Sequence, residues 1–250
     1  MRKISVFIAV MAAVIIMSPA AFGISYKFYA EPVTGINLES VRELFVRAMD
    51  KQSGDTYIEG DVKAQYELGV LFVEMYSATQ FDGSVDYDEA KNYGKLYNLN
   101  QAAYWLRKAA YRDYAPAQYL LYNIGRWADV DSVPYMWLDK SVELGYARAQ
   151  AQKADLELHK VDSMIHKGED STEALKQVIR LAEKSAEQGD AIGMYVLSRI
   201  YKNKRYPVYD ELKSAEWEKK ARKAAKNDPT IDFDDDDEED LPKIREKKKK

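Results

Sequence analysis

Apolar side chains recur every three or four positions from Leu38 onward, which is the spacing of one buried face of an α-helix. Similar stretches, separated by short polar breaks, continue to about residue 226, and no clear alternation with a period of two appears beyond residue 98. We therefore predict an all-α domain over residues 38–226. The first predicted helix carries the following recurring apolar residues: Leu38, Val41, Leu44, Phe45, Ala48 and Met49.

Three stretches lack this helical pattern. Residues 24–37 are mixed and are predicted to be an irregular lead-in. Residues 51–60 are polar and contain two glycines, which favours a connection between helices. Residues 77–98 combine glycines, aspartates and aromatic residues, and we predict an insertion loop there, since long loops within compact domains are often functional.

Four tracts of the predicted domain share one pattern, which begins with a bulky residue and has lysine three positions later. Small residues follow, and on a helix they share a face with the bulky residue, so that a neighbouring helix can approach closely. Gly145 and Gly189 stand where the first helix of a pair must end, because glycine adopts the left-handed conformation at little cost, and Asp113 takes that place in the first tract. The bulky residues are Trp105, Trp137, Leu181 and Trp217.

The succession of a bulky residue, KAA, EQG and AxAQ resembles the Sel1-like repeat, a relative of the tetratricopeptide repeat. The resemblance implies a short, degenerate solenoid of about four to five helix pairs that winds as a right-handed superhelix. Lys153 and Ala154 replace the usual leucine and glycine, and Leu181 replaces the aromatic residue. The resemblance also implies an adaptor or scaffold that binds proteins, without catalytic residues or a cofactor. Exported bacterial members resemble host-interaction factors, envelope adaptors and immunity proteins.

The first 23 residues have the three-part order of a secretory signal peptide. Arg2 and Lys3 precede an uncharged apolar stretch over residues 4–17, which is shorter than the roughly 20 residues of a membrane-spanning helix. Small residues before Ile24 predict cleavage after Gly23, although an uncleaved anchor stays open as an alternative. We thus expect a bacterial protein that is periplasmic or secreted and not stably inserted in a membrane.

The composition and the charge of the chain exclude several kinds of site and of partner. The chain has no cysteine, which excludes disulfides, thiolate metal sites and a lipid-modified cysteine. Its net charge of −4 argues against a nucleic-acid partner. Residues 227–250 carry an acidic block and then a basic block, so we predict a disordered tail, either solubilising or used as an electrostatic docking arm.

The predicted partner-binding surface is the concave surface of the solenoid, which is lined by the side of the first repeat helix opposite Trp105. Tyr104 and Tyr111 are central, because tyrosine and arginine anchor many protein interfaces. The alternative is a solvated helix face of mixed charge whose lysines belong to the repeat pattern. The predicted binding residues are Tyr104, Arg107, Lys108, Tyr111, Lys140, Glu143, Arg180 and Lys184.

Two groups of residues suggest metal ligands. His159, Asp162 and His166 follow Asp155 at helical spacing and could hold zinc, or simply flank a core stripe as solvated residues. A second group, formed by Asp82, Asp86 and Asp88, lacks the spacing of a calcium-binding loop. Because common catalytic motifs are missing, we predict a scaffold that is not an enzyme. An inhibitor or immunity protein is the alternative, and a zinc-binding protein is a lesser one.

Overall fold

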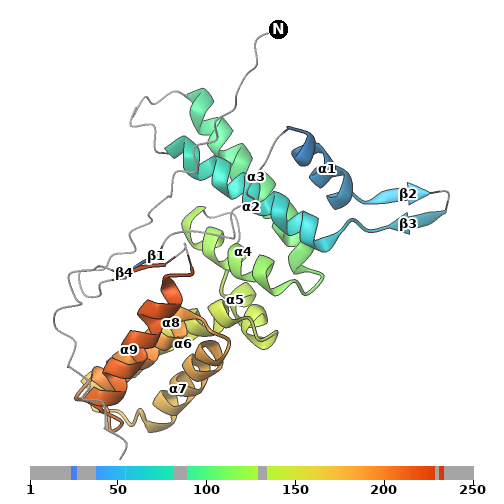
Figure 1. The fold of residues 1–250 in the computed structure, drawn as a ribbon. Coiled ribbons are helices and arrows are strands. Elements are labelled where there is room, and N and C mark those ends of the chain that lie inside the picture. Colours follow the sequence, from blue (N-terminus) through green and yellow to red (C-terminus); the bar gives the residue numbers. More distant parts are fainter. Residues whose placement is uncertain are drawn as a thin grey trace, which may run out of the picture. The chain divides into compact units, whose positions relative to one another are not determined.

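The computed structural model describes residues 24–26, 38–53, 55–80, 89–128, 134–228 and 231–233 (Figure 1). The predicted signal peptide, the three aspartates of the calcium hypothesis and the acidic and basic blocks of the tail lie outside these residues. The described residues divide into two compact units. Unit 1 holds those between residues 38 and 128, and unit 2 holds residues 24–26 and those between 134 and 233.

Unit 1 is built on four helices among its described residues, α1 (Leu38–Ala48), α2 (Val62–Gln80), α3 (Glu89–Ala110) and α4 (Ala115–Ala128). Each helix packs against the next, and α2 also contacts α4. The side chains of Leu68, Leu106 and Leu121 are fully buried between the helices. Phe45 adds edge-on contacts to Phe72 and Trp105, with ring centroids 6.3 and 5.8 Å away. A hairpin of β2 (Lys51–Ser53) and β3 (Thr56–Ile58) joins α1 to α2.

Unit 2 repeats this neighbour-to-neighbour packing with α5 (Pro134–Glu143), α6 (Ala147–Lys167), α7 (Thr172–Glu187), α8 (Ala191–Lys202) and α9 (Glu211–Ala225). A contact between α6 and α8 brings the second helices of successive pairs together. The apolar core of this unit is continuous across α6 to α9 and includes Leu158, Val178, Val196 and Ile200. Such packing of each helix on its neighbours is typical of a helical solenoid, so the all-α prediction is confirmed for the described residues. The right-handed superhelix stays a prediction.

The turns between paired helices follow the predicted pattern. Asp113, Gly145 and Gly189 adopt positive φ angles of 56°, 80° and 87°. After each, a backbone N–H donates to a carbonyl five residues earlier, and that carbonyl belongs to the first small residue of the repeat tract. These small residues are fully buried, which allows the close helix approach that the sequence predicted. They are Ala109, Ser141 and Ser185, with Ala221 at the same place in the fourth tract.

A buried glutamine in the second helix reinforces the turn between α3 and α4 and, at the same place, the connection between α1 and α2. Gln118 Nε2 donates to Ala110 O at 3.0 Å, across 8 residues. In the first pair, Gln65 Nε2 donates to Ala48 O at 3.1 Å, across 17 residues. Each bond joins the fourth residue of a second helix to the last residue of the helix before it. Because one bond spans 17 residues and the other 8, the connection between α1 and α2 has nine more residues than the connection between α3 and α4. The hairpin β2–β3 occupies this enlarged turn.

Four short strands correct the sequence analysis. The stretch predicted as a polar connection, residues 51–60, forms the hairpin. The predicted irregular lead-in contains β1 (Ile24–Tyr26), and the predicted disordered tail contains β4 (Ile231–Phe233). These two strands pair antiparallel, and Ile231 is buried in the core of unit 2, which gives the tail an apolar anchor. Each strand has only three residues, too few for alternation to be visible in the sequence.

The insertion loop predicted over residues 77–98 is wrong at both ends. Helix α2 continues to Gln80, and α3 begins at Glu89, so the glycine at position 94 lies within a helix. The helical pattern of this stretch is weak in the sequence, and the two helices are stabilised instead by packing of α2 against α3. Among the described residues, no helix is both long enough and apolar enough to cross a membrane.

Candidate protein-binding surface

Exposed apolar side chains of unit 1 occur in three adjoining elements. Val46 lies in the last turn of α1 and Met49 directly follows that helix, Tyr57 and Ile58 lie on β3, and Tyr104 lies in the second half of α3. Tyr57 and Tyr104 expose 64% and 50% of their surface. Tyr111, one residue beyond α3, exposes 69%, and its position seven residues after Tyr104 places both side chains on the same helical face. Tyrosine is enriched at protein interfaces, so these exposed rings are candidates for partner contact.

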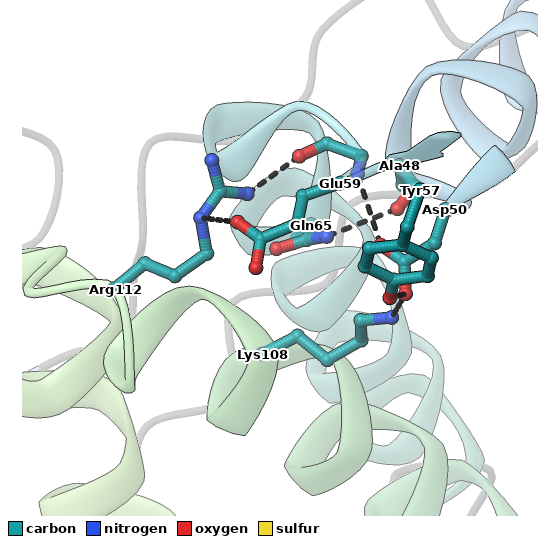
Figure 2. A network of polar contacts seen from close by, with 8 residues as sticks. Ala48, Asp50, Tyr57, Glu59, Gln65, Lys108 and Arg112 are labelled. Atoms are coloured by element: carbon teal, nitrogen blue, oxygen red, sulfur yellow. Dashed lines mark hydrogen bonds and ion pairs between the residues drawn. The ribbon is translucent and has the colours of Figure 1, made fainter. Parts of the chain in front are cut away.

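Asp50 holds the base of the hairpin against α3 (Figure 2). Its carboxylate accepts hydrogen bonds from the Gly60 N–H at 2.9 Å and from the Tyr57 hydroxyl at 2.6 Å, and it forms an ion pair with Lys108. The Gly60 N–H, followed by Lys108 and Tyr57, lowers the pKa of Asp50 to about 2, because these donors favour the charged form. The carboxylate therefore stays ionised at neutral pH and fixes the hairpin to the neighbouring helix pair.

Arg112 secures the other side of this base. Its guanidinium donates to Gly60 O at 2.5 Å and lies 3.1 Å from the Glu59 carboxylate. Gly60 itself must be glycine, since a Cβ there would lie 1.9 Å from Ala48 O. The hairpin is thus fastened at residues 59 and 60 to the turn that follows α3.

Lys108 connects the hairpin to the exposed tyrosines of α3. Its ammonium lies 5.8 Å from the centre of the Tyr104 ring, and the Tyr104 ring packs edge-on against Trp105 at 5.0 Å. Tyr57 on β3, Asp50 before β2, and Lys108 and Tyr104 on α3 therefore form one connected set. We call this set, together with Tyr111, the aromatic surface.

The predicted binding residues divide between the two units. Tyr104 and Tyr111 are exposed, Arg107 is half-buried, and Lys108 is engaged by Asp50. In unit 2, Glu143, Arg180 and Lys184 are exposed, whereas the Lys140 ammonium lies 5.2 Å from the Trp137 ring centre.

Three of the lysines in the repeat tracts contact the tryptophan of their own tract. Lys220 lies 4.0 Å from the Trp217 ring centre, and Lys108 and Lys140 lie over the leading tryptophans of their own tracts at 6.0 and 5.2 Å. Cation–π contacts of this kind stabilise the repeat itself. Tyrosines are therefore better candidates than lysines for partner contact.

Sequence reasoning missed Asp50 and Tyr57. Asp50 precedes Lys108 by 58 residues, and no local pattern joins them. In the sequence, Asp50 follows a helix and precedes a short polar segment that contains Tyr57. This pattern does not differ from that of an ordinary loop.

The histidine row of α6 is engaged by other side chains. Asp155 forms an ion pair with Arg199 and lies 3.9 Å from His159. Asp162 accepts a hydrogen bond from the Tyr206 hydroxyl at 2.8 Å, and Arg205 lies 3.1 Å from the Nε2 atom of His166. The hydroxyl of Tyr206 has a raised pKa, through burial and this carboxylate. Within the described ranges, no group of three acidic or histidine side chains is arranged to hold a metal ion.

Comparisons with known proteins give a limited likeness. No model of a known protein family matches the chain, and no curated protein sequence matches it. The chain is similar to the crystal structure of a Sel1 repeat protein from Oxalobacter formigenes, with 19% identity, a TM-score of 0.39, and coverage of 66% of this chain and 63% of that one. It is also similar to a protective antigen present in uropathogenic Escherichia coli strains that displays an SLR fold. That likeness has 18% identity, a TM-score of 0.39, and coverage of 64% of this chain and 38% of that one.

The chain therefore spans less than two thirds of the length of either structure. Two features of the molecule itself support the repeat type. The small residues of the tracts are buried at helix contacts, and the left-handed residues end the first helices. In these repeat tracts and helix pairs, the chain resembles Sel1-like repeat proteins.

Proposed function

We propose that this chain is a non-catalytic scaffold that binds a protein partner through the aromatic surface of unit 1. The observation that carries the proposal is the pair of exposed tyrosines that contact one ion pair, Tyr57 and Tyr104, together with the exposed Tyr111. Tyrosine combines a large apolar ring with a hydroxyl and loses little conformational entropy on binding, so it often anchors interfaces.

The fixed geometry of the surface supports the same role. Asp50, Gly60 and Arg112 hold the hairpin base through hydrogen bonds and ion pairs before any partner arrives. Binding to a preorganised surface loses less conformational entropy than binding to a mobile loop.

We further propose that the protein is exported to the periplasm or secreted, with cleavage after Gly23 of the predicted signal peptide. Mass spectrometry of the chain recovered from fractionated bacterial cells tests this. A mature protein that begins at Ile24 in the periplasm or medium supports export, and a cytoplasmic protein that retains residue 1 contradicts it.

The binding role is tested by crosslinking the protein in intact bacterial envelopes, followed by capture and quantitative mass spectrometry. The double variant Tyr104→Ala/Tyr111→Ala should lose at least tenfold of the recovered partner, because two exposed anchors are removed. The matched control is Tyr209→Ala/Leu212→Ala, which removes two exposed side chains from unit 2.

Unchanged recovery with the first double variant, at equal protein level and helical content, would contradict the proposal. Equal losses with both variants would also contradict it. If the partner is a single toxic enzyme in equal amount, the scaffold acts as an inhibitor. If it is a set of envelope subunits, the scaffold acts as an adaptor.

A further inference from the structure

The hairpin β2–β3 forms an incomplete sheet. It consists of two strands of three residues, and all six side chains are exposed. Figure 1 shows it extending away from the helices of its own unit. A two-stranded hairpin is marginally stable alone, and this one depends on the contacts at its base. A third strand would complete hydrogen bonding along an outer edge.

The outer edge of β3 is the one suited to accept a strand. Ser53 pairs with Thr56 across the two-residue turn, and Gln52 pairs with Tyr57. Pairs alternate in an antiparallel ladder, and the pair next to a two-residue turn is hydrogen-bonded, so the backbone N–H and C=O of Tyr57 point outward. No other strand among the described residues pairs with this edge.

The chemistry of β3 also lacks the usual protection of an edge. Proteins commonly place a charged residue, above all lysine, or a proline on exposed edge strands to prevent pairing with other chains. Thr56, Tyr57 and Ile58 carry no charge, and Tyr57 and Ile58 remain at least half exposed on opposite faces. Lys51 stands on the other strand.

The edge is continuous with the aromatic surface. The Tyr57 hydroxyl donates to Asp50, and Asp50 is paired with Lys108 next to the Tyr104 ring. A strand that pairs with β3 would therefore carry its side chains alternately toward Tyr57 and toward Ile58. Aromatic and β-branched residues contact such neighbours best.

We propose that the outer edge of β3 binds an extended, uncharged segment of a partner protein, which adds as a third strand through the backbone of Tyr57. The inference rests on the proposed protein-binding function and names the form that the partner takes. Backbone hydrogen bonds supply affinity, and alternate side chains supply selectivity, as in other cases of strand addition.

The test uses random 12-residue peptides displayed on phage, selected against the purified chain, with the recovered peptides then synthesised. Tyr57→Pro removes the outward N–H of β3, which makes no hydrogen bond to β2. The control Tyr57→Val removes the ring but keeps the N–H. We expect selected peptides to bind Tyr57→Pro at least tenfold more weakly than Tyr57→Val. We also expect the Tyr57 amide of the wild-type chain to exchange with solvent at least tenfold more slowly when a peptide is bound.

Equal affinity for the proline and valine variants would overturn the inference, as would unchanged exchange at the Tyr57 amide. Protection of this amide only by self-association, seen as a concentration-dependent mass in sedimentation, would also overturn it and assign the edge to a second copy. Unaltered exchange at Gly60 in Tyr57→Pro checks that the hairpin base is intact.

Failure of the envelope crosslinking alone would remove the proposed function and leave the edge chemistry standing. Failure of the peptide test alone would leave a protein-binding scaffold that uses side chains only.

Discussion

Asp50→Asn is expected to loosen the hairpin by about 1–2 kcal/mol at pH 7. The native carboxylate, about 20% exposed, accepts from Gly60, Tyr57 and Lys108, which lower its pKa from 3.8 to about 2. This difference in pKa corresponds to about 2.4 kcal/mol of stabilisation by the charged form. Solvent screening at a partly exposed site reduces that value.

The pH dependence has a definite sign. Because the folded pKa lies below the unfolded one, the stabilisation is fully present above about pH 4 and is lost as the pH falls through 3.8 toward 2. Roughly half of the difference between Asp50→Asn and the wild type should remain at pH 3. At pH 2 little of it should remain.

Amide hydrogen exchange at Gly60 is the direct assay, since this N–H donates to Asp50. Asp50→Asn should raise the exchange rate of Gly60 about 5- to 30-fold relative to the wild type at pH 7. Asp55→Asn, an exposed change in the same hairpin, should leave it nearly constant. The reasoning would be refuted by a pKa of Asp50 near 3.8. It would also be refuted if the ratio of the Gly60 exchange rates in Asp50→Asn and the wild type did not decline between pH 7 and pH 2.

Three further predictions concern stability. Burial raises the pKa of Glu74 to about 7, and among the described residues its Oε1 has no hydrogen-bond partner. Its carboxylate destabilises the fold as the pH rises from 4.5 through 7, so Glu74→Gln should stabilise the fold by about 1–2 kcal/mol at pH 8 and by little at pH 4 in urea unfolding. Gly189→Ala should cost about 1–2 kcal/mol in thermal unfolding, because φ is 87° while no atom obstructs the added Cβ, and an unaltered melting temperature would contradict this. Arg148→Met should cost about 2–3 kcal/mol, since it leaves Asp190 buried without its cation and removes the ion pair between Arg148 and Asp228. A cost below about 0.5 kcal/mol would show that these ion pairs are dispensable.

Helix pairs were predictable because their physical causes are local. Gly145 and Gly189 end helices by a conformation that glycine adopts cheaply, and Ser141 and Ser185 are small because another helix touches them. Each cause leaves a mark at fixed spacing in the sequence.

The pairing of β1 with β4 and the contacts at the base of the hairpin join residues that are far apart in the sequence. Ile24 pairs with Phe233, and Asp50 pairs with Lys108, yet neither pair leaves a local signal. The hairpin exposes all its strand residues, so it lacks the alternation of buried and exposed positions that identifies a strand. Tyr104 was identifiable as a binding candidate from its helical face, whereas Tyr57 needed the structure.

The central claim is that the aromatic surface contacts a partner protein, and site-specific photocrosslinking in intact cells tests it most directly. A photoreactive amino acid would replace Tyr104 in one strain and Leu212, an exposed residue of unit 2, in another. Irradiation should give a discrete, larger adduct with a partner protein from position 104 and none from position 212. Adducts from position 212 alone, or equal adducts from both positions, would contradict the account.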